Sequence, residues 1–333
     1  MLSRPVRGGV LLTELGLGAA QLGNLYRETT DEEARGALSA AWDAGIRYFD
    51  TAPHYGLGLS ERRLGALLAG RPRDEFVIST KVGRLLQPTP QNAKLLDDEG
   101  FVVPASSRRV FDFSRDGILR SVEASLERLG MDRVDILYLH DPDQHWEAAS
   151  TTGVDALIEL REQGVVRAIG AGMNQAEMLT EFVRRCDVDV VMCAGRYTLL
   201  EQPALEELLP VAVERGVAVV AAAVYNSGLL SAPTVASDAS YDYGPAPAEL
   251  IARARAIADI CAAAGVSLPA AALAYPLRHP AVASVVVGAR NAAQVSSNVE
   301  RAAAEIPDSL WTELAAAGLI PNESLHRRES ADD

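Results

Sequence analysis

Residues 45–56 read GIRYFDTAPHYG, a short apolar run that ends on a charged residue and continues into a turn containing proline. The run IRYFD ends on Asp50, and two later runs have the same form: EFVISTK ends on Lys81 and VDILYLH ends on His140. Short, mostly apolar runs of this kind are typical of strands in a parallel sheet, which is buried on both faces. The three segments therefore predict parallel strands that each carry a polar side chain at the carboxyl end.

Eight such runs alternate with longer amphipathic segments, as expected for a parallel sheet with crossover helices. The expected strands cover residues 14–19, 46–50, 75–81, 134–140, 166–171, 189–192, 217–222 and 283–287. The amphipathic segments are expected to form helices, for example at residues 31–43, 116–128, 154–163, 204–215 and 249–264. This pattern predicts an α/β protein that closes into a (β/α)8 TIM barrel, and the apolar residues around 9–12 predict an N-terminal β-hairpin that plugs the barrel floor.

An open, doubly wound sheet is the alternative architecture, and its nucleotide site usually reads G-x-G-x-x-G after the first strand. The segment GLGAAQ at residues 16–21 lacks the last glycine of that pattern. No linker rich in proline or serine divides the chain, so we expect residues 1–333 to form a single barrel domain with a polar tail at about 322–333. Two long loops, at residues 82–115 and 231–248, are expected over the carboxyl-terminal face of the barrel.

The composition favours a small-molecule substrate over a nucleic acid or a membrane as the partner. The 333 residues carry a formal net charge of −14 with a sequence pI near 4.9, whereas nucleic-acid binding normally requires a basic surface. No apolar run approaches the roughly 18 residues that span a membrane, and no targeting signal is recognisable. Three cysteines without a C-x-x-C pair indicate neither a disulfide framework nor structural zinc and suit the reducing cytoplasm. The oligomeric state stays open between a monomer and a homodimer.

A candidate catalytic cluster follows from the predicted strand ends. If the three strands are neighbours, Asp50, Lys81 and His140 converge at one mouth of the barrel, where active sites of this fold lie, and Tyr55 lies in a loop at that mouth. A phenol has a pKa of about 10, and a neighbouring ammonium favours the tyrosinate, so Lys81 is expected to lower the pKa of Tyr55 and make it a proton donor and acceptor. Asp50 would hold Lys81 charged, and His140 would direct a substrate oxygen toward Tyr55.

Each of the four residues also has a simpler explanation as a turn former, a surface lysine, a structural histidine or an ordinary loop aromatic. Their joint placement favours the catalytic interpretation. A metal site is another alternative, because barrels host metal-dependent hydrolases and suitable ligand types occur at His140, Asp141, Asp143 and His145. No second histidine cluster stands at another expected strand end, so we expect no metal.

The loops after the seventh and eighth expected strands read NSGLL at residues 226–230 and GARN at residues 288–291. In barrels these two loops frequently hold a phosphate, because glycines let the backbone approach the anion and a following helix points its amides at it. Ordinary turn and capping chemistry explains either loop alone. Together with a proton-relay tyrosine, a phosphate site predicts a nucleotide cofactor and hydride transfer. The residues concerned are Asn226, Ser227, Gly228, Leu230, Gly288 and Arg290.

The runs GIRYFDTAPHYG (45–56), STKVG (79–83) and VDILYLH (134–140) resemble the signatures of the aldo-keto reductase family around its Asp, Tyr, Lys and His tetrad. The resemblance covers nearly the whole chain. It implies a (β/α)8 barrel without a metal and an extended nicotinamide dinucleotide across the mouth. It also implies that Tyr55 is the proton donor or acceptor of a tetrad completed by Asp50, Lys81 and His140. Further positions that match the family's cofactor contacts are Gly18, Ala19, Asn174, Gln294 and Asn298.

Several positions depart from the common pattern of the family. Met173 stands where a serine usually precedes the asparagine, Cys193 where a glutamine also binds the carboxamide, and Ala222 near where a tyrosine often stacks on the nicotinamide. Gln294 replaces the arginine that typically meets the 2′-phosphate of NADP, while Arg290 keeps some positive charge. Losing a guanidinium fork weakens phosphate recognition, so NAD, or dual use of NAD and NADP, is expected over strict use of NADP.

With FSRDGILRS (113–121), AGRYTLL (194–200) and YNSG (225–228), these departures resemble the subgroup of D-threo-aldose 1-dehydrogenases, L-fucose dehydrogenases and pyridoxal 4-dehydrogenases. The resemblance implies oxidation of a cyclic hemiacetal, in which Tyr55 removes the hydroxyl proton, hydride passes from the ring carbon to the nicotinamide, and a lactone forms. Aldoses of the L-fucose and D-arabinose type are the expected substrates, with pyridoxal oxidation or general aldehyde or ketone reduction as alternatives. The non-enzymatic alternative is a regulatory barrel that senses redox state through bound cofactor.

Overall fold

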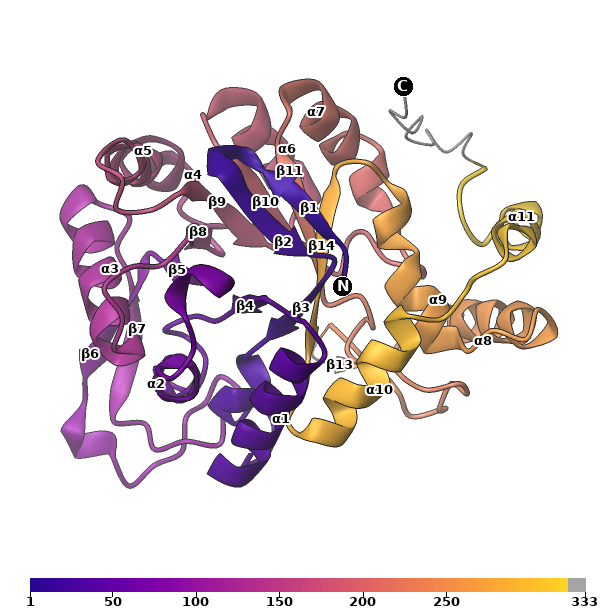
Figure 1. The fold of residues 1–333 in the computed structure, drawn as a ribbon, viewed down its shortest axis with the longest axis horizontal. Helices are drawn as coiled ribbons and strands as arrows, with labels where there is room; N and C mark the ends of the chain where they lie inside the picture. The colour runs from indigo at the N-terminus through magenta and orange to yellow at the C-terminus, as the bar shows by residue number, and fades with distance from the viewer. Residues whose placement is uncertain (243, 323–333) are drawn as a thin grey trace.

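The computed structural model describes residues 1–242 and 244–322 and shows a closed barrel of eight parallel strands (Figure 1). The strands follow one another around the barrel in chain order, and the last pairs with the first to close it. The predicted barrel is confirmed, and every expected strand ends within two residues of its predicted limits. The barrel strands are β3 (Leu15–Gly18), β4 (Tyr48–Asp50), β5 (Val77–Val82), β8 (Ile136–His140), β9 (Ala168–Met173), β10 (Val190–Ala194), β11 (Ala218–Ala222) and β14 (Val282–Gly288).

Helices surround the barrel, and the first of them shows how the sequence sets their ends. In α1 (Asp31–Asp43), the Thr30 hydroxyl accepts the Glu33 N–H while the Glu33 carboxylate accepts the Thr30 N–H, a reciprocal capping box that starts the helix. In Figure 1, α1 lies beside α10 (Ala292–Ala302). The remaining helices are α2 (Leu59–Leu68), α3 (Arg115–Leu129), α4 (Trp146–Ala148), α5 (Val154–Glu162), α6 (Ala176–Arg185), α7 (Leu208–Arg215), α8 (Ala248–Ala263), α9 (Leu268–Ala274) and α11 (Asp308–Ala316).

One predicted helix begins later than expected. The segment 204–215 was predicted as a single helix, but α7 begins at Leu208 and a short 3-10 turn covers Pro203–Leu205. Pro210 explains the difference, since proline has no N–H to donate and is tolerated only in the first turn of a helix.

The N-terminal hairpin closes the amino-terminal end of the barrel. Its strands, β1 (Ser3–Val6) and β2 (Val10–Thr13), pair antiparallel, and Val10 and Leu12 are fully buried. They pack in one cluster with side chains of the barrel interior, including Tyr48. The predicted plug is therefore confirmed, and the opposite mouth, where the barrel strands end, remains for the candidate site.

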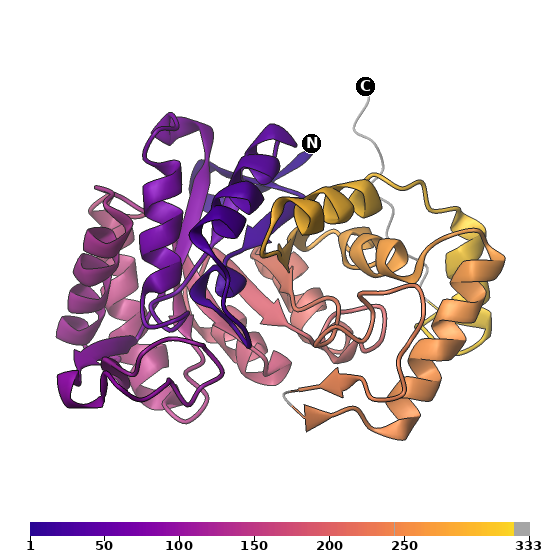
Figure 2. The same ribbon diagram turned by 90° about the horizontal axis from the view of Figure 1, so that it is seen from below.

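Each long loop contains an antiparallel strand pair of its own. β6 (Arg84–Pro88) pairs with β7 (Ser107–Phe111), and β12 (Ser240–Tyr241) pairs with β13 (Gly244–Pro245). In Figure 2 both loops lie along the lower edge of the molecule, whereas the N-terminus lies along the upper edge. The loops are thus at the carboxyl-terminal end of the barrel strands, as expected.

Two further expectations concern the chain as a whole. Within the described residues no single helix has the length and apolar character needed to cross a membrane, although the bent pair Ala248–Ala263 and Leu268–Arg278 meets both criteria jointly, by length and composition only. The predicted polar tail falls, apart from Asn322, on residues outside the described part of the chain.

Candidate active site

A buried ion pair between Lys81 of β5 and Asp50 of β4 forms the centre of the site. Lys81 Nζ lies 2.7 Å from Asp50 Oδ2 and also donates to the Thr51 carbonyl at 3.0 Å. Only 2% of Lys81 and 3% of Asp50 are exposed. Burial disfavours the charged ammonium, but the Asp50 carboxylate and Tyr55 together more than offset this and raise the pKa of Lys81 above its ordinary value. The lysine therefore stays positively charged.

A chain of buried hydroxyl groups supports Asp50 from inside the barrel. Ser79 donates its hydroxyl to Asp50 Oδ1 at 2.7 Å, and the Tyr48 hydroxyl lies 3.1 Å from Ser79 Oγ. The Tyr138 hydroxyl lies 3.2 Å from that of Tyr48. Burial raises the pKa of both tyrosines, so they remain neutral hydrogen-bonding groups. Because these side chains come from three adjacent strands, the sheet itself fixes the carboxylate.

Tyr55 lies in the loop between β4 and α2, with Lys81 Nζ 4.8 Å from the centroid of its ring. The next residue, Gly56, has a φ of 61°, and a Cβ there would lie 2.2 Å from the Gly23 carbonyl oxygen. Only glycine lets the two backbones meet in this conformation, and their contact sets the loop at the barrel mouth.

The pKa of Tyr55 corrects one expectation from the sequence. Burial raises this pKa and outweighs the lowering effect of Lys81, while Asp50 raises it further. The prediction of a net lowering by Lys81 is therefore wrong, because the ammonium acts in the expected direction but desolvation is the larger effect. Tyr55 is a neutral phenol at physiological pH and is ready to donate a proton.

Two histidines face Tyr55: His140 at the end of β8 and His54, its neighbour in sequence. The His140 ring centroid lies 5.9 Å from that of Tyr55 and 5.5 Å from that of His54. Burial, followed by the positive charge of Arg84, lowers the pKa of His54 to about 2 and that of His140 well below its ordinary value. Both rings are neutral. Among the described residues, neither buried Nδ1 atom has a hydrogen-bond partner, and that of His54 lies 3.7 Å from a carboxylate oxygen of Glu99.

These side chains line a cavity of about 570 Å³ whose rim is acidic. Asp98 and Glu99, from the loop after β5, and Asp141, directly after β8, contribute three carboxylates to its wall. Arg84 of β6 donates to Asp141 at 2.5 Å and partly balances its charge. Asp141 has a φ of 40°, a left-handed conformation that is uncommon outside glycine and that clusters at ligand-binding sites.

Arg109 of β7 holds the loop that carries Asp98 and Glu99 beside Tyr55. Its guanidinium donates to both carboxylate oxygens of Asp97, at 2.5 and 3.0 Å, and to the His54 carbonyl at 3.0 Å. Phe101, from the same loop, packs its ring against those of His54 and Tyr55. The long loop is therefore part of the cavity wall rather than a peripheral flap.

Comparison with known proteins identifies this arrangement. A model of the Aldo/keto reductase family matches residues 14–318, which include the whole barrel and all the side chains described above. The chain belongs to the aldo/keto reductase family. The D-threo-aldose 1-dehydrogenase of Pseudomonas sp. is 53% identical to it over 316 residues, which cover 94% of this chain and 96% of that protein. The pyridoxal 4-dehydrogenase of Microbacterium luteolum is 43% identical over 333 residues, with the same coverage of each chain.

A solved structure of an aldo-keto reductase has the same fold. The aldo-keto reductase AKR11C1 from Bacillus halodurans, in its holo form, superimposes with a TM-score of 0.74 at 26% identity, and the match covers 95% of this chain and 96% of the other.

Aldo/keto reductases use NAD(P)H, and a second cavity of about 410 Å³ continues from the first along the barrel mouth. The two share lining residues, among them Gln21, Asn174 and Gly288, and the second is also lined by Asn226, Ser227 and Gly228. Together they form an elongated groove that starts at Tyr55 and passes the loops after β11 and β14.

The residues present in this groove fit a dinucleotide. Gln21 Oε1 and Asn226 Oδ1 are buried and have no hydrogen-bond partner among the described residues, so they can accept from donors such as a carboxamide or ribose hydroxyls. A Cβ at Gly288 would lie 2.1 Å from the Gln21 side chain, which shows how closely the groove is built there. Glycine at 288 therefore leaves room for the Gln21 side chain in its present position.

Only some of the other predicted cofactor residues line the groove. Gly18 lines the groove, whereas the side chains of Ala19 and Leu230 are fully buried and line neither cavity. Three predicted residues of the adenosine end, Arg290, Gln294 and Asn298, lie at and along α10 outside both cavities.

Three residues were noted in the sequence as differing from the family's usual nicotinamide contacts, and two of them line the first cavity. Met173 and Ala222 line the first cavity, but Cys193 is fully buried, while its neighbours Met192 and Ala194 line it. Alternate residues of a strand point to opposite faces, so Cys193 points outward into the core beneath the helices. The interpretation of Cys193 as a cofactor-facing position is therefore wrong, and Ala194 occupies the wall.

Within the described residues, no group of three or more His, Cys, Asp or Glu side chains is placed to hold a metal ion, so His140, Asp141, Asp143 and His145 do not form a metal site.

Several residues of this aldo/keto reductase site were not found from the sequence. His54 could have been noticed as the neighbour of Tyr55, but the roles of Arg84 and Arg109 depend on contacts 57 and 55 residues away. Further lining residues found only in the structure include Gln21, Leu25, Tyr26, Asp98, Glu99 and Phe101.

Proposed function

We propose that this aldo/keto reductase is an NAD(P)-dependent aldose 1-dehydrogenase, which oxidises the C1 hemiacetal of aldoses of the L-fucose and D-arabinose type to lactones. The observation that carries the proposal is the buried Lys81–Asp50 pair beside Tyr55, in one cavity with the neutral ring of His140. The 53% identity to a D-threo-aldose 1-dehydrogenase supports the choice of substrate class.

The roles of the four residues follow from their electrostatics. Tyr55 first gives up its own proton, and the permanent charge of Lys81 stabilises the resulting tyrosinate. This tyrosinate then takes the proton of the C1 hydroxyl and becomes the neutral phenol again as hydride leaves C1. Asp50 keeps Lys81 charged and in place, while the neutral His140 orients the reacting oxygen by a hydrogen bond. Bound NAD(P) supplies the acceptor for the hydride that leaves C1. Residues of the groove that would hold it are Gly18, Asn174, Asn226, Ser227, Gly228 and Gly288, and the segment with Arg290, Gln294 and Asn298 lies beyond the groove at its adenosine end.

The acidic rim supports a neutral, hydroxyl-rich substrate. Carboxylates such as Asp98, Glu99 and Asp141 accept hydrogen bonds from sugar hydroxyls, whereas they repel a phosphate or a second carboxylate. The ammonium that lies deep in the cavity, that of Lys81, is already paired with Asp50. Unphosphorylated aldoses therefore fit this wall better than sugar phosphates or acids.

The remaining parts of the proposal concern the cofactor and the assembly. Gln294, in place of a guanidinium, supports NAD or dual use over strict use of NADP. We also propose that the chain is one barrel domain over residues 1–333, that it works in the cytoplasm, and that it is a monomer or a homodimer.

A second candidate is oxidation of pyridoxal, favoured by the 43% identity to a pyridoxal 4-dehydrogenase. Its cyclic hemiacetal presents the same reacting group, so the tetrad alone does not separate the two substrates. General aldehyde or ketone reduction uses the same residues in the opposite direction, and a redox-sensing barrel would use only the cofactor groove.

Steady-state assays with L-fucose, D-arabinose, pyridoxal and a simple aldehyde, each with NAD and NADP, test the proposal. The expected result is the highest kcat/KM for one of the two aldoses, with the lactone as the product. Turnover of pyridoxal alone would replace the sugar assignment with the second candidate. Tight dinucleotide binding without hydride transfer in a single turnover would favour the sensing barrel.

A further inference from the structure

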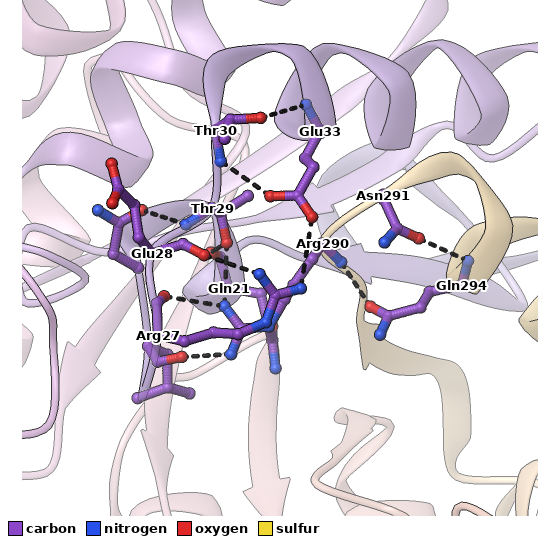
Figure 3. Close-up of polar contacts among 11 residues, drawn as sticks. Gln21, Arg27, Glu28, Thr29, Thr30, Glu33, Arg290, Asn291 and Gln294 are labelled. Carbon is purple, nitrogen blue, oxygen red and sulfur yellow. Dashed lines mark hydrogen bonds and ion pairs between the residues drawn. The ribbon is translucent and has the colours of Figure 1, made fainter.

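The groove leads from the catalytic cavity to the start of α10. Gly288, in its wall, is two residues before Arg290, and Tyr225, also in its wall, donates its hydroxyl to Asn298 Oδ1 of α10 at 3.2 Å. A dinucleotide with its reactive ring at Tyr55 therefore directs its adenosine ribose toward the segment between β14 and α10. Figure 3 shows the polar contacts of that segment.

Arg290 is committed to a neighbouring loop and is not available to a ligand. Its guanidinium donates to the carbonyls of Leu25 and Arg27, the latter at 3.2 Å, and to the Thr29 hydroxyl at 2.9 Å. These three acceptors lie in the loop that precedes α1 (Figure 3). A phosphate at this position would have to compete with all three for the guanidinium.

The backbone amides at the same place are also bonded within the chain. The Arg290 N–H donates to Gln294 Oε1 at 2.8 Å, and the Gln294 N–H donates to Asn291 Oδ1 at 3.0 Å. These two backbone N–H groups, which could otherwise donate hydrogen bonds to an anion, are thus bonded to neutral side chains.

Glu33 adds a fixed negative charge beside this segment. Its carboxylate accepts the Thr30 N–H at 2.9 Å and lies 3.4 Å from the Arg27 guanidinium (Figure 3). It also interacts with the side chain of Asn291 and with the charge of Arg290. The hydrogen bond from Thr30, with help from Arg27, lowers the pKa of Glu33, so the group is ionised at neutral pH.

We propose that Glu33 is a specificity-determining residue for the cofactor: it excludes a dinucleotide with a phosphate on the adenosine ribose and accepts one with a free hydroxyl there. A ribose hydroxyl can donate a hydrogen bond to a carboxylate, whereas a phosphate dianion meets a like charge and finds the nearby donors already bonded. This inference rests on the proposed NAD(P)-dependent function and deepens it, since it assigns the preference for NAD to one carboxylate.

The variant Glu33→Gln tests the charge while it keeps the structure. Glutamine serves in a capping box as well as glutamate does, so the start of α1 is preserved. Glu32→Gln is the matched control, because Glu32 is exposed in the same turn of α1 and its substitution removes the same formal charge. The readout is the Kd for NADH and for NADPH, measured by fluorescence titration of the full chain without substrate.

The wild-type protein is expected to bind NADH on the order of tenfold more tightly than NADPH, and Glu33→Gln to tighten NADPH binding on the order of fivefold with NADH nearly unchanged. The gain should shrink between 0.05 and 0.5 M salt, since exposed charges are screened. Adding Gln294→Arg to Glu33→Gln should tighten NADPH binding further.

Equal affinity of the wild type for the two dinucleotides, or the same shift in Glu32→Gln as in Glu33→Gln, would overturn the role of Glu33 and leave the proposed function intact. Failure of the wild type to bind either dinucleotide would instead overturn the proposed function. A circular dichroism melt of each variant verifies that the chain is folded.

Discussion

The ammonium of Lys81 and the carboxylate of Asp50 are held 2.7 Å apart with almost no exposed surface, while Ser79 donates to the second carboxylate oxygen and the Thr51 carbonyl accepts from the ammonium. Two opposite charges in such surroundings depend on each other, because removal of one leaves the other buried and unpaired. The first prediction follows from that dependence.

Asp50→Asn is expected to reduce the free energy of unfolding by about 3–5 kcal/mol, because it strands the Lys81 charge. The double variant Asp50→Asn/Lys81→Met removes both charges and should regain most of that loss, yet it should remain inactive since nothing then stabilises the Tyr55 anion. Urea unfolding and hydride-transfer assays measure the two properties separately. Activity in the double variant would contradict the role of Lys81.

Tyr55→Phe should abolish turnover and leave the Kd for dinucleotide largely unchanged. The substitution removes only the hydroxyl that exchanges the proton, while the ring still packs on Phe101 and His54. Single-turnover absorbance and a binding titration check the two halves of this expectation. Retention of full activity by the phenylalanine variant would mean that another group transfers the proton.

Acid should destabilise the protein through its buried histidines. The pKa of His54 is lowered to about 2 in the folded protein, whereas in the unfolded chain it has its usual value of about 6.5. At a pH below 6.5, His54 therefore binds a proton in the unfolded chain but not in the folded one. The free energy of unfolding should therefore fall as the pH falls from 6.5, by roughly 2 kcal/mol at pH 5 from His54 alone. His140, whose pKa is also lowered, acts in the same direction.

Urea unfolding at pH 7 and pH 5 measures this effect. His54→Asn should lose less stability on acidification than the wild type, by roughly the 2 kcal/mol that one histidine contributes. An identical loss in both proteins would show that His54 takes up its proton in the folded state.

Asp141→Asn is expected to raise the KM for aldoses by about tenfold and to change kcat little, since the carboxylate binds substrate hydroxyls without taking part in proton transfer. Asp143→Asn is the matched control: it removes a nearby carboxylate that is not part of the cavity wall. Kinetics with an aldose and with a simple aldehyde separate the two effects. A loss of equal size on both substrates would place Asp141 in the chemistry and not in substrate recognition.

The barrel was predictable because its strands are short apolar runs buried on both faces, and the convergence of Asp50, Lys81 and His140 follows once those strands are parallel neighbours. Tyr55 was found for the same reason, since it lies only five residues beyond Asp50. Local patterns were sufficient for every one of these features.

The missing features depend on quantities that periodicity does not contain. Arg84 and Arg109 act through contacts between distant segments, and the conformation of the long loop that brings them there has no repeating pattern. The pKa of Tyr55 depends on a balance between desolvation and the charge of Lys81, so its sign required the degree of burial. Cys193 was misplaced because a shift of one residue in a strand exchanges its two faces.

The antiparallel pair β6–β7 brings the two ends of a long loop together before the chain returns to the barrel, with Arg84 opposite Phe111. The strand pair thus connects the loop tip, residues 89–106, to the barrel. Exchange of this tip for one of another sequence would alter Asp98, Glu99 and Phe101 while Lys81 and His140 stay on the barrel strands. This makes residues 89–106 a region for library design toward new sugar dehydrogenases, provided that Asp97 is retained to receive Arg109 and that the backbone bonds of Gly100 and Val102 to Tyr26 and Asn24 are kept.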